Sequence, residues 1–265
     1  LGTLGVMVPY TPLHLLLLDD LGFPVVATSG NRSGDPICID NDEALDCLGG
    51  IADLFLVHNR PIVRPIDDSV IRVVEDRIVV MRLARGLAPA VVHSETGSSS
   101  VLAAGGHMKS AFAFADKGRL ILSQHTGELD TPRSRRNYQS SIDDLGQLIS
   151  ITPGHVACDM HPDYFSTRYA ATLGTPVTVQ HHLAHILTAI ADHRLKEPVL
   201  GLSWDGTGLG EDNTIWGGEA FIVDAEAYER TASMRQFALP GAERAVHDPR
   251  RAAVGLLQAC FAGRY

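Results

Sequence analysis

The sequence predicts an α/β fold in two domains joined by a flexible segment. Short apolar runs alternate along the chain with segments of helical periodicity. Glycine is frequent, at 25 of 265 residues, while aromatic residues make up only 6%, which favours a fold with many strand-to-helix turns. The polar stretch 87–100 (LAPAVVHSETGSSS) interrupts the pattern and is typical of a linker. We therefore expect a first domain over 1–90, a linker over 91–100 and a second domain over 101–265.

In the first domain, a turn-rich loop over 29–34 follows a short β-branched run. In open α/β sheets, ligands bind at the carboxyl ends of strands, where this loop would lie. Asp40 is placed to cap the next helix. The elements expected here are a helix over 13–21, a strand over 24–28, a helix over 41–48, and strands over 54–57, 70–74 and 78–82.

In the second domain, three strands are followed by helix, strand, helix and strand, which is the opening of the actin-like nucleotide-binding fold. Arg133, Arg135 and Arg136 are isolated among polar residues and are interpreted as the solvated start of a helix. The elements expected are strands over 101–104, 110–115 and 119–123, a helix over 134–151, strands over 155–160 and 176–180 with a short helix between them, a helix over 181–194, a strand over 198–204 and a hairpin through 216–219.

Charge and composition exclude several classes of partner. The net charge of −9 argues against nucleic acid, which is bound through clustered basic residues. The apolar stretches are shorter than a membrane span and no signal peptide is present, so we expect no membrane partner. Four cysteines form no CxxC pair and are expected to be reduced thiols of a cytoplasmic protein: Cys38, Cys47, Cys158 and Cys260.

The strongest local pattern is the pair His181 and His185. They are four residues apart at the start of a predicted helix, so both imidazoles project from one face. Two ligands on one helix are typical of transition-metal sites. Asp205, at the end of the next strand, could complete a set that suits Zn²⁺ or Fe²⁺. The alternative is a polar helix start that binds no metal.

Two glycine-rich segments could bind phosphate. Gly206, Thr207 and Gly208 follow Asp205 after an apolar strand, and exposed amides in such a turn can cradle a phosphate. An ordinary turn is the alternative. A second segment, 105–106, precedes Lys109, whose amine could reach the phosphates of a nucleotide or an acyl phosphate. A solvated hairpin lysine is the alternative there.

The first domain offers polar groups for a phosphate as well. Ser29, Asn31 and Ser33 carry donors on one loop, although such loops are also frequent turns. Arg82 and Arg85 could clamp a phosphate or pair with surface carboxylates.

Two acidic segments have both a binding and a local interpretation. Residues 67–69 (DDS) could contact Mg²⁺ or a substrate, but a turn before the strand at 70 is the interpretation preferred on local grounds. Asp159, His161 and Asp163 follow a strand end and could bind a ligand or brace the histidine helix.

Taken together, these segments resemble the HypF-type carbamoyltransferases of hydrogenase maturation. The loop 29–36 (SGNRSGDP) is similar to the Ser-x-Asn loop of YrdC-type domains, which form carbamoyl adenylates. Further segments of the first domain that resemble the family are 51–53, 60–63, 67–69, 82, 84–86 and 89. In the second domain they are 105–109, 123–125, 127–130, 159–164, 180–185, 204–208 and 217–219.

The resemblance implies the C-terminal part of a YrdC-like α/β domain, followed by the N-terminal part of an actin-like (Kae1-like, ASKHA) domain. In the family, the carbamoyl group of carbamoyl phosphate is activated with ATP as carbamoyl adenylate. The metal-containing domain then transfers it to the C-terminal cysteine of a HypE-type partner protein. The thiocarboxamide is dehydrated there to the cyanide ligand of nickel–iron hydrogenase.

The resemblance also implies roles for single residues, with ATP, Mg²⁺ and either Zn²⁺ or Fe²⁺ as cofactors. Lys109 and Asp205 are expected to be catalytic, and His181, His185 and Asp205 to bind the metal. The residues expected to bind the nucleotide are Ser29, Asn31, Ser33, Arg85, Gly206, Thr207 and Gly208.

The sequence also departs from the family pattern. The acylphosphatase domain, the zinc fingers and the second half of the Kae1-like domain are not in this chain, so we expect the chain alone to be inactive. His107 stands where the family more often has Glu. Three alternatives remain: an O-carbamoyltransferase of small-molecule biosynthesis, which has the modules in the opposite order; the tRNA threonylcarbamoyl-adenosine machinery, disfavoured by the acidic charge; and an inactive binding remnant.

Overall fold

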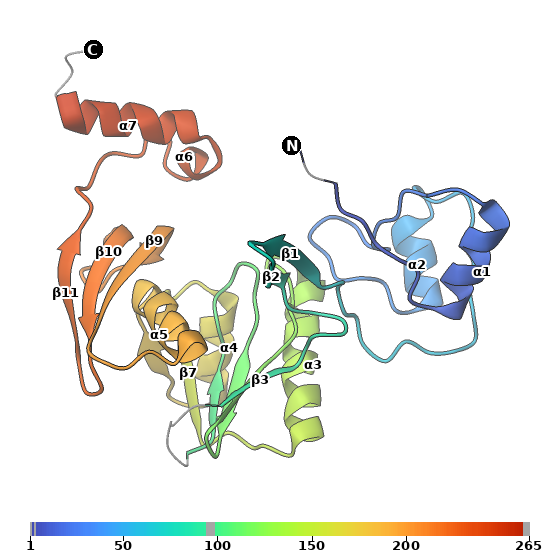
Figure 1. The fold of residues 1–265 in the computed structure, drawn as a ribbon, viewed down its shortest axis with the longest axis horizontal. Helices are drawn as coiled ribbons and strands as arrows, with labels where there is room; N and C mark the ends of the chain where they lie inside the picture. The colour runs from blue at the N-terminus through green and yellow to red at the C-terminus, as the bar shows by residue number, and fades with distance from the viewer. Residues whose placement is uncertain (1, 3, 94–98, 262–265) are drawn as a thin grey trace.

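The structure, a computed structural model, describes residues 2, 4–93 and 99–261. Figure 1 shows an N-terminal part (residues 2–89) beside a C-terminal part (residues 90–261). The elements are α1 (Pro12–Leu21), α2 (Asn41–Leu48), β1 (Val70–Val74), β2 (Arg77–Arg82), β3 (Ala90–His93), β4 (Val101–Ala103), β5 (Ala113–Asp116), β6 (Arg119–Leu122), α3 (Pro132–Ile149), β7 (His155–Asp159), α4 (Phe165–Leu173), β8 (Val177–Val179), α5 (His181–His193), β9 (Val199–Leu209), β10 (Ile215–Val223), β11 (Tyr228–Ser233), α6 (Glu243–His247) and α7 (Pro249–Phe261).

The N-terminal part contains both predicted helices and the predicted hairpin. Asp40 caps α2 as expected, because its carboxylate accepts hydrogen bonds from the amides of Asp42 and Glu43. Strands β1 and β2 pair in antiparallel fashion. The turn between them places Glu75 and Asp76 at φ values of 49° and 61°, as tight hairpins require.

Two predicted strands, 24–28 and 54–57, are wrong: both segments are irregular. They are also exposed rather than buried, with Val26 at 102% and Leu54 at 90% of full exposure. A strand needs a neighbour that takes up its backbone hydrogen bonds, and neither segment pairs with another strand in the described part of the chain. An apolar run is therefore not sufficient to predict a strand here.

The C-terminal part is built on a six-stranded sheet in the order β3-β6-β5-β4-β7-β8. Strands β4, β7 and β8 run parallel, and the other pairs are antiparallel. The register places Leu102, Phe114 and Ile121 in one row across three strands. Tyr138 and Ile142 of α3 pack on this row to form the main core, which fixes α3 against the sheet.

The predicted linker, 91–100, is wrong over residues 91–93, which belong to β3 and pair with β6 at the edge of the sheet. The run Ala-Val-Val-His has β propensity, but the polar residues that follow it led to its interpretation as part of a linker. The rest of the linker prediction falls mostly on residues 94–98, which lie outside the described residues.

The start of α3 is close to the prediction, but one arginine there is not solvated. Thr131 caps the helix and forms a reciprocal capping box with Ser134. The side chain of Arg133 is only 20% exposed and contacts Glu43 of α2. The interpretation of Arg133 as part of a solvated helix start is therefore wrong, because the N-terminal part covers it.

A second, three-stranded sheet has the order β11-β10-β9 and packs against α5. Its strand β9 runs on through residues 205–208, so the predicted glycine-rich turn there is wrong. Gly208 pairs with Trp216 and Trp204 pairs with Gly218, with a register shift between them that forms a bulge. Pairing with β10 thus holds the glycines in extended backbone.

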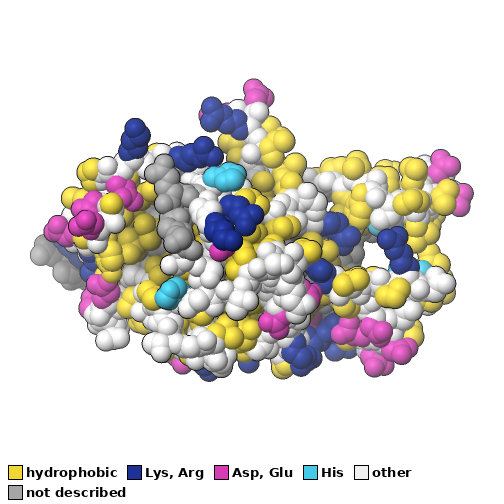
Figure 2. Space-filling model, turned by 90° about the horizontal axis from the view of Figure 1, so that it is seen from below, with side chains coloured by type: hydrophobic (Ala, Val, Ile, Leu, Met, Phe, Trp, Pro, Cys, Tyr) yellow, Lys and Arg dark blue, Asp and Glu magenta, His cyan; other side chains and the backbone are white. Residues whose placement is uncertain are grey.

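Apolar side chains are widely exposed. On β9, Leu200, Leu202 and Trp204 are 66%, 72% and 82% exposed, so one face of the small sheet is apolar. Figure 2 shows apolar groups spread over the visible face, with acidic groups gathered at both ends of the molecule. Within the described residues, no helix combines the length and the hydropathy needed to span a bilayer.

Candidate functional site

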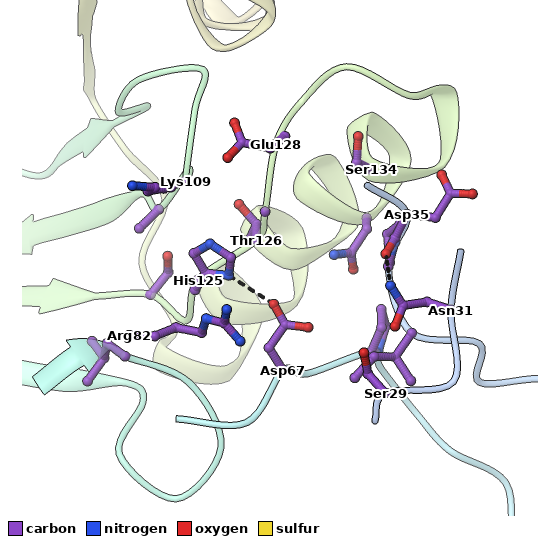
Figure 3. Close-up of a pocket in the computed structure, with 18 of the residues that line it drawn as sticks. Ser29, Asn31, Asp35, Asp67, Arg82, Lys109, His125, Thr126, Glu128 and Ser134 are labelled. Atoms are coloured by element: carbon purple, nitrogen blue, oxygen red, sulfur yellow. Dashed lines mark hydrogen bonds and ion pairs between the residues drawn. The ribbon is translucent and has the colours of Figure 1, made fainter. Parts of the chain in front are cut away.

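A cavity of about 580 Å³ lies at the junction of the two parts of the chain. The N-terminal part contributes Ser29, Asn31 and Arg82, and the C-terminal part contributes Lys109 and His125. Figure 3 shows Ser29 and Asn31 on one side of the cavity, facing Lys109, His125 and Arg82 on the other. The cavity is large enough for a small-molecule ligand and has polar groups on opposite walls.

Internal hydrogen bonds shape the loop that carries Ser29 and Asn31. The side-chain nitrogen of Asn31, Nδ2, donates to the backbone carbonyl oxygens of Asp35, at 2.9 Å, and Arg32, at 3.0 Å. The Cys38 amide donates to the Gly30 carbonyl at 2.9 Å. The loop is therefore preformed, as a phosphate-binding loop would be.

Of the other residues predicted to bind the nucleotide in this part, neither Ser33 nor Arg85 lines the cavity. Arg85 lies 3.4 Å from Asp68 and stacks over the ring of Tyr10. The prediction chose Arg85 as the nucleotide-binding arginine, but Arg82 is the one that lines the cavity.

The pair of Asp67 and His125 joins the two parts of the chain at the cavity wall. The His125 Nδ1 atom lies 2.9 Å from Asp67 Oδ2. The local interpretation of 67–69 as only a turn is therefore incomplete for Asp67. No signal in the sequence could have found this pair, because its members are 58 residues apart.

The hydrogen bond from His125 lowers the pKa of Asp67 below its ordinary value. A lowered folded-state pKa contributes stability above the unfolded value, about pH 4, and that contribution is lost as the pH falls through the folded value. We expect the Asp67→Asn variant to be less stable at neutral pH and to lose less stability in acid. Urea unfolding at several pH values would test this, and identical pH dependence of the two proteins would contradict it.

The predicted metal ligands come together at a second site, between α5 and β9. Ligand atoms of His181, His185 and Asp205 all lie within 4.8 Å of one another. The Nε2 atoms of the two histidines lie 3.1 Å and 3.7 Å from the same oxygen, Asp205 Oδ2. Two imidazole nitrogens and a carboxylate suit Zn²⁺ or Fe²⁺, so the residues fit the expected ion.

Asp159 orients His181 from the end of β7. Its Oδ2 lies 2.7 Å from His181 Nδ1, and its side chain is only 7% exposed. This hydrogen bond raises the pKa of His181. It also keeps a proton on Nδ1, so that in the neutral imidazole the Nε2 lone pair is available to an ion beside Asp205. The sequence suggested such bracing by Asp159, and the geometry agrees.

We expect Asp159→Asn to weaken metal binding about 10- to 100-fold, because groups that orient a ligand contribute this much to affinity. Competition with a chromogenic chelator would measure the change. Asp163→Asn is a matched control, because Asp163 is exposed on the same loop. Equal metal affinities of the two variants would refute the role of Asp159.

The glycine-rich segment serves the histidine site in a way that was not predicted. The Gly206 amide donates to Asp205 Oδ1 at 2.6 Å and so orients that carboxylate. A Cβ at Gly208 would lie 3.0 Å from the Cβ of His181 and 2.6 Å from the ring of His182. Gly208 thus allows β9 to approach α5. A nucleotide-binding role for Gly206, Thr207 and Gly208 stays a prediction.

Three family models match consecutive stretches of the chain. The model described as "Telomere recombination" (the Sua5, YciO and YrdC family) matches residues 1–84. The HypF Kae1-like domain matches residues 96–192. The second subdomain of the carbamoyltransferase Kae1-like domain matches residues 201–264.

The curated relatives include the carbamoyltransferase HypF of Synechocystis, 46% identical over 97% of this chain and 34% of its own length. HypF of Rhizobium leguminosarum is 41% identical over 100% of this chain and 36% of its own length. This chain belongs to the HypF family. It spans about a third of the length of these HypF relatives.

Solved HypF structures have the same fold. Full-length HypF in a phosphate- and nucleotide-bound form matches with a TM-score of 0.90 at 42% identity, over 98% of this chain and 41% of that chain. HypF of T. kodakarensis matches with a TM-score of 0.89 at 34% identity, over 97% of this chain and 34% of that chain. The predicted combination of YrdC-like and Kae1-like folds is thereby confirmed.

Proposed function

We propose that the protein is a carbamoyltransferase of nickel–iron hydrogenase maturation. ATP activates a carbamoyl group derived from carbamoyl phosphate as carbamoyl adenylate in the junction cavity, with Mg²⁺ on the phosphates. The C-terminal cysteine of a HypE-type partner then accepts the carbamoyl group at the histidine site. The observation that carries the proposal is the presence of both sites in one chain that is 46% identical to a protein named carbamoyltransferase HypF.

The lining of the cavity suits an adenylate-forming step. Ser29 and Asn31 offer hydroxyl and amide groups on a preformed loop, and Arg82 and Lys109 offer positive charge to phosphate oxygens. Water first hydrolyses carbamoyl phosphate to carbamate and phosphate. A carbamate oxygen then attacks the α-phosphorus of ATP, the bond from that phosphorus to the bridging oxygen breaks, and pyrophosphate leaves. Preorganised cations that face the leaving group favour this charge separation.

The histidine site suits the transfer step. A Zn²⁺ or Fe²⁺ ion held by His181, His185 and Asp205 would supply Lewis-acid polarisation of the carbamoyl oxygen. Asp159 keeps His181 in the tautomer that can bind such an ion. The thiolate of the partner attacks the carbamoyl carbon and AMP leaves, so the adenylate provides the leaving group.

The test uses the natural protein that contains this chain, incubated with carbamoyl phosphate, ATP and a HypE-type partner. The expected results are AMP and pyrophosphate release that depends on carbamoyl phosphate, and a partner that gains the mass of one carbamoyl group at its C-terminal cysteine. ATP cleavage without transfer to the partner would contradict the proposal. Transfer to a small-molecule hydroxyl instead would favour an O-carbamoyltransferase.

Lys109→Ala and Lys117→Ala make a matched pair for this assay. Both lysines have a φ of 47°, so removal of either side chain has a similar effect on the backbone. Lys109 lines the cavity, whereas Lys117 lies in the turn between β5 and β6 and is not part of the lining. Only the Lys109 variant is expected to slow AMP release.

A further inference from the structure

The guanidinium of Arg133 connects the two parts of the chain between α2 and α3, beside the cavity. It lies 2.7 Å from Glu43 Oε1 and 3.7 Å from Asp35 Oδ2. Its nitrogens also lie 3.4 Å from the sulfur of Cys47 and 3.8 Å from that of Cys38. The side chains of Arg133 and Asp35 are 20% and 19% exposed and that of Glu43 is 35% exposed, so the cluster is partly shielded from solvent.

The position of Arg133 on its own helix is unfavourable for a cation. It lies in the first turn of α3, directly after Pro132 and the cap Thr131. The amino end of a helix carries partial positive charge and favours anions. The contacts that compensate for this placement come from the N-terminal part of the chain, which indicates that the residue serves the junction rather than α3.

The residues that Arg133 contacts are the ones that shape the loop of the cavity. The Cys38 amide donates to the Gly30 carbonyl, and the Asp35 carbonyl accepts from the Asn31 side chain, both at 2.9 Å. Figure 3 shows Asn31 and Asp35 beside Ser134, the neighbour of Arg133 in the sequence. Movement of segment 35–47 away from α3 would therefore move the loop.

We propose that Arg133 is a positioning residue that holds segment 35–47 against α3 and thereby sets the Ser29–Asn31 wall of the cavity. The C-terminal part would then position the Ser29–Asn31 wall of the cavity, in addition to holding the histidine site. The effect on nucleotide binding rests on the proposed function, whereas the contact between α2 and α3 does not.

The planar guanidinium suits this role better than an ammonium. Its fork reaches a carboxylate and the two sulfurs at once, whereas lysine offers a single point charge. Arg133→Lys is therefore expected to keep only part of the effect, and Arg133→Ala to lose it.

A charge exchange tests the contact without a ligand. Arg133→Glu and Glu43→Arg are each expected to lower the urea midpoint of unfolding, because each places like charges together. The double variant is expected to unfold at a higher urea concentration than Arg133→Glu alone. If the two single effects simply add in the double variant, the contact does not hold the parts together and the inference fails.

ATP affinity, measured by calorimetry, tests the positioning role. Arg133→Glu is expected to weaken ATP binding about tenfold, with partial recovery in the double variant. Arg136→Ala is the control, because Arg136 is exposed on the same helix, and its ATP affinity is expected to match wild type.

The outcomes separate the inference from the proposed function. Wild-type protein that binds no ATP would remove the proposed ligand, while the unfolding cycle would still decide the contact. If the unfolding effects of the two single variants are not additive in the double variant, but ATP affinity is unchanged in all Arg133 variants, the positioning role is overturned. Coupling together with a rescued affinity would establish it, because general destabilisation would not be rescued by a charge exchange.

Discussion

Wild-type protein is expected to bind one metal ion at the histidine site, and protein with His181→Ala or His185→Ala is expected to bind almost none. Both imidazoles converge on Asp205, and removal of either leaves two donors on an open site. Even groups that only orient a ligand contribute about 10- to 100-fold to affinity, so loss of a ligand itself should exceed that range. Metal content after dialysis, measured by plasma mass spectrometry, reports the change.

The two histidines should differ in how their loss affects the apo protein. His181 is hydrogen bonded to Asp159, so its removal leaves a buried carboxylate without that partner. His185 is 57% exposed, so its removal should hardly change the stability of the metal-free protein.

His193→Ala is the matched control for the metal measurement. It lies at the end of the same helix, 70% exposed and 3.9 Å from Asp192. It is expected to bind as much metal as wild type. Wild-type metal content in the His181 and His185 variants would refute the ligand assignment and leave a polar helix start, the alternative that the sequence left open.

Gly105→Ala is expected to destabilise the protein by about 2–5 kcal/mol, the sum of a left-handed backbone and overpacking. Gly105 has a φ of +70°, which residues with a side chain adopt at a cost. An added Cβ would also collide with the backbone carbonyl of Ala111, which cannot rotate away as a side chain could. Urea unfolding of the two proteins measures the difference.

Gly106→Ala is the control, because it adds the same methyl group to the neighbouring glycine of the segment. A Cβ at Gly106 meets nothing within 4 Å, so this variant is expected to lie within about 1 kcal/mol of wild type. If both variants are equally stable, the backbone conformation at Gly105 is not the reason for the glycine.

Helices were the elements best predicted from the sequence. For α1, α2, α3 and α5, the caps and the apolar periodicity lie within the helix itself, so the boundaries agree within two residues. The strands predicted at 24–28 and 54–57 failed, while β9 exceeded its predicted end. A strand depends on a partner elsewhere in the chain, which a local pattern does not contain.

The sequence by itself determined the helices, the His181–His185 spacing and the family, because each depends on residues close together in the chain or on motifs in a fixed order. Tertiary structure alone decided which distant groups meet across the junction: Asp67 with His125 at the cavity wall, 58 residues apart, and Arg133 with Cys47 beside it, 86 apart. Such contacts carry no periodicity in the sequence. They form only when the N-terminal part packs against the C-terminal part, and the same packing places Arg82 rather than Arg85 at the cavity wall.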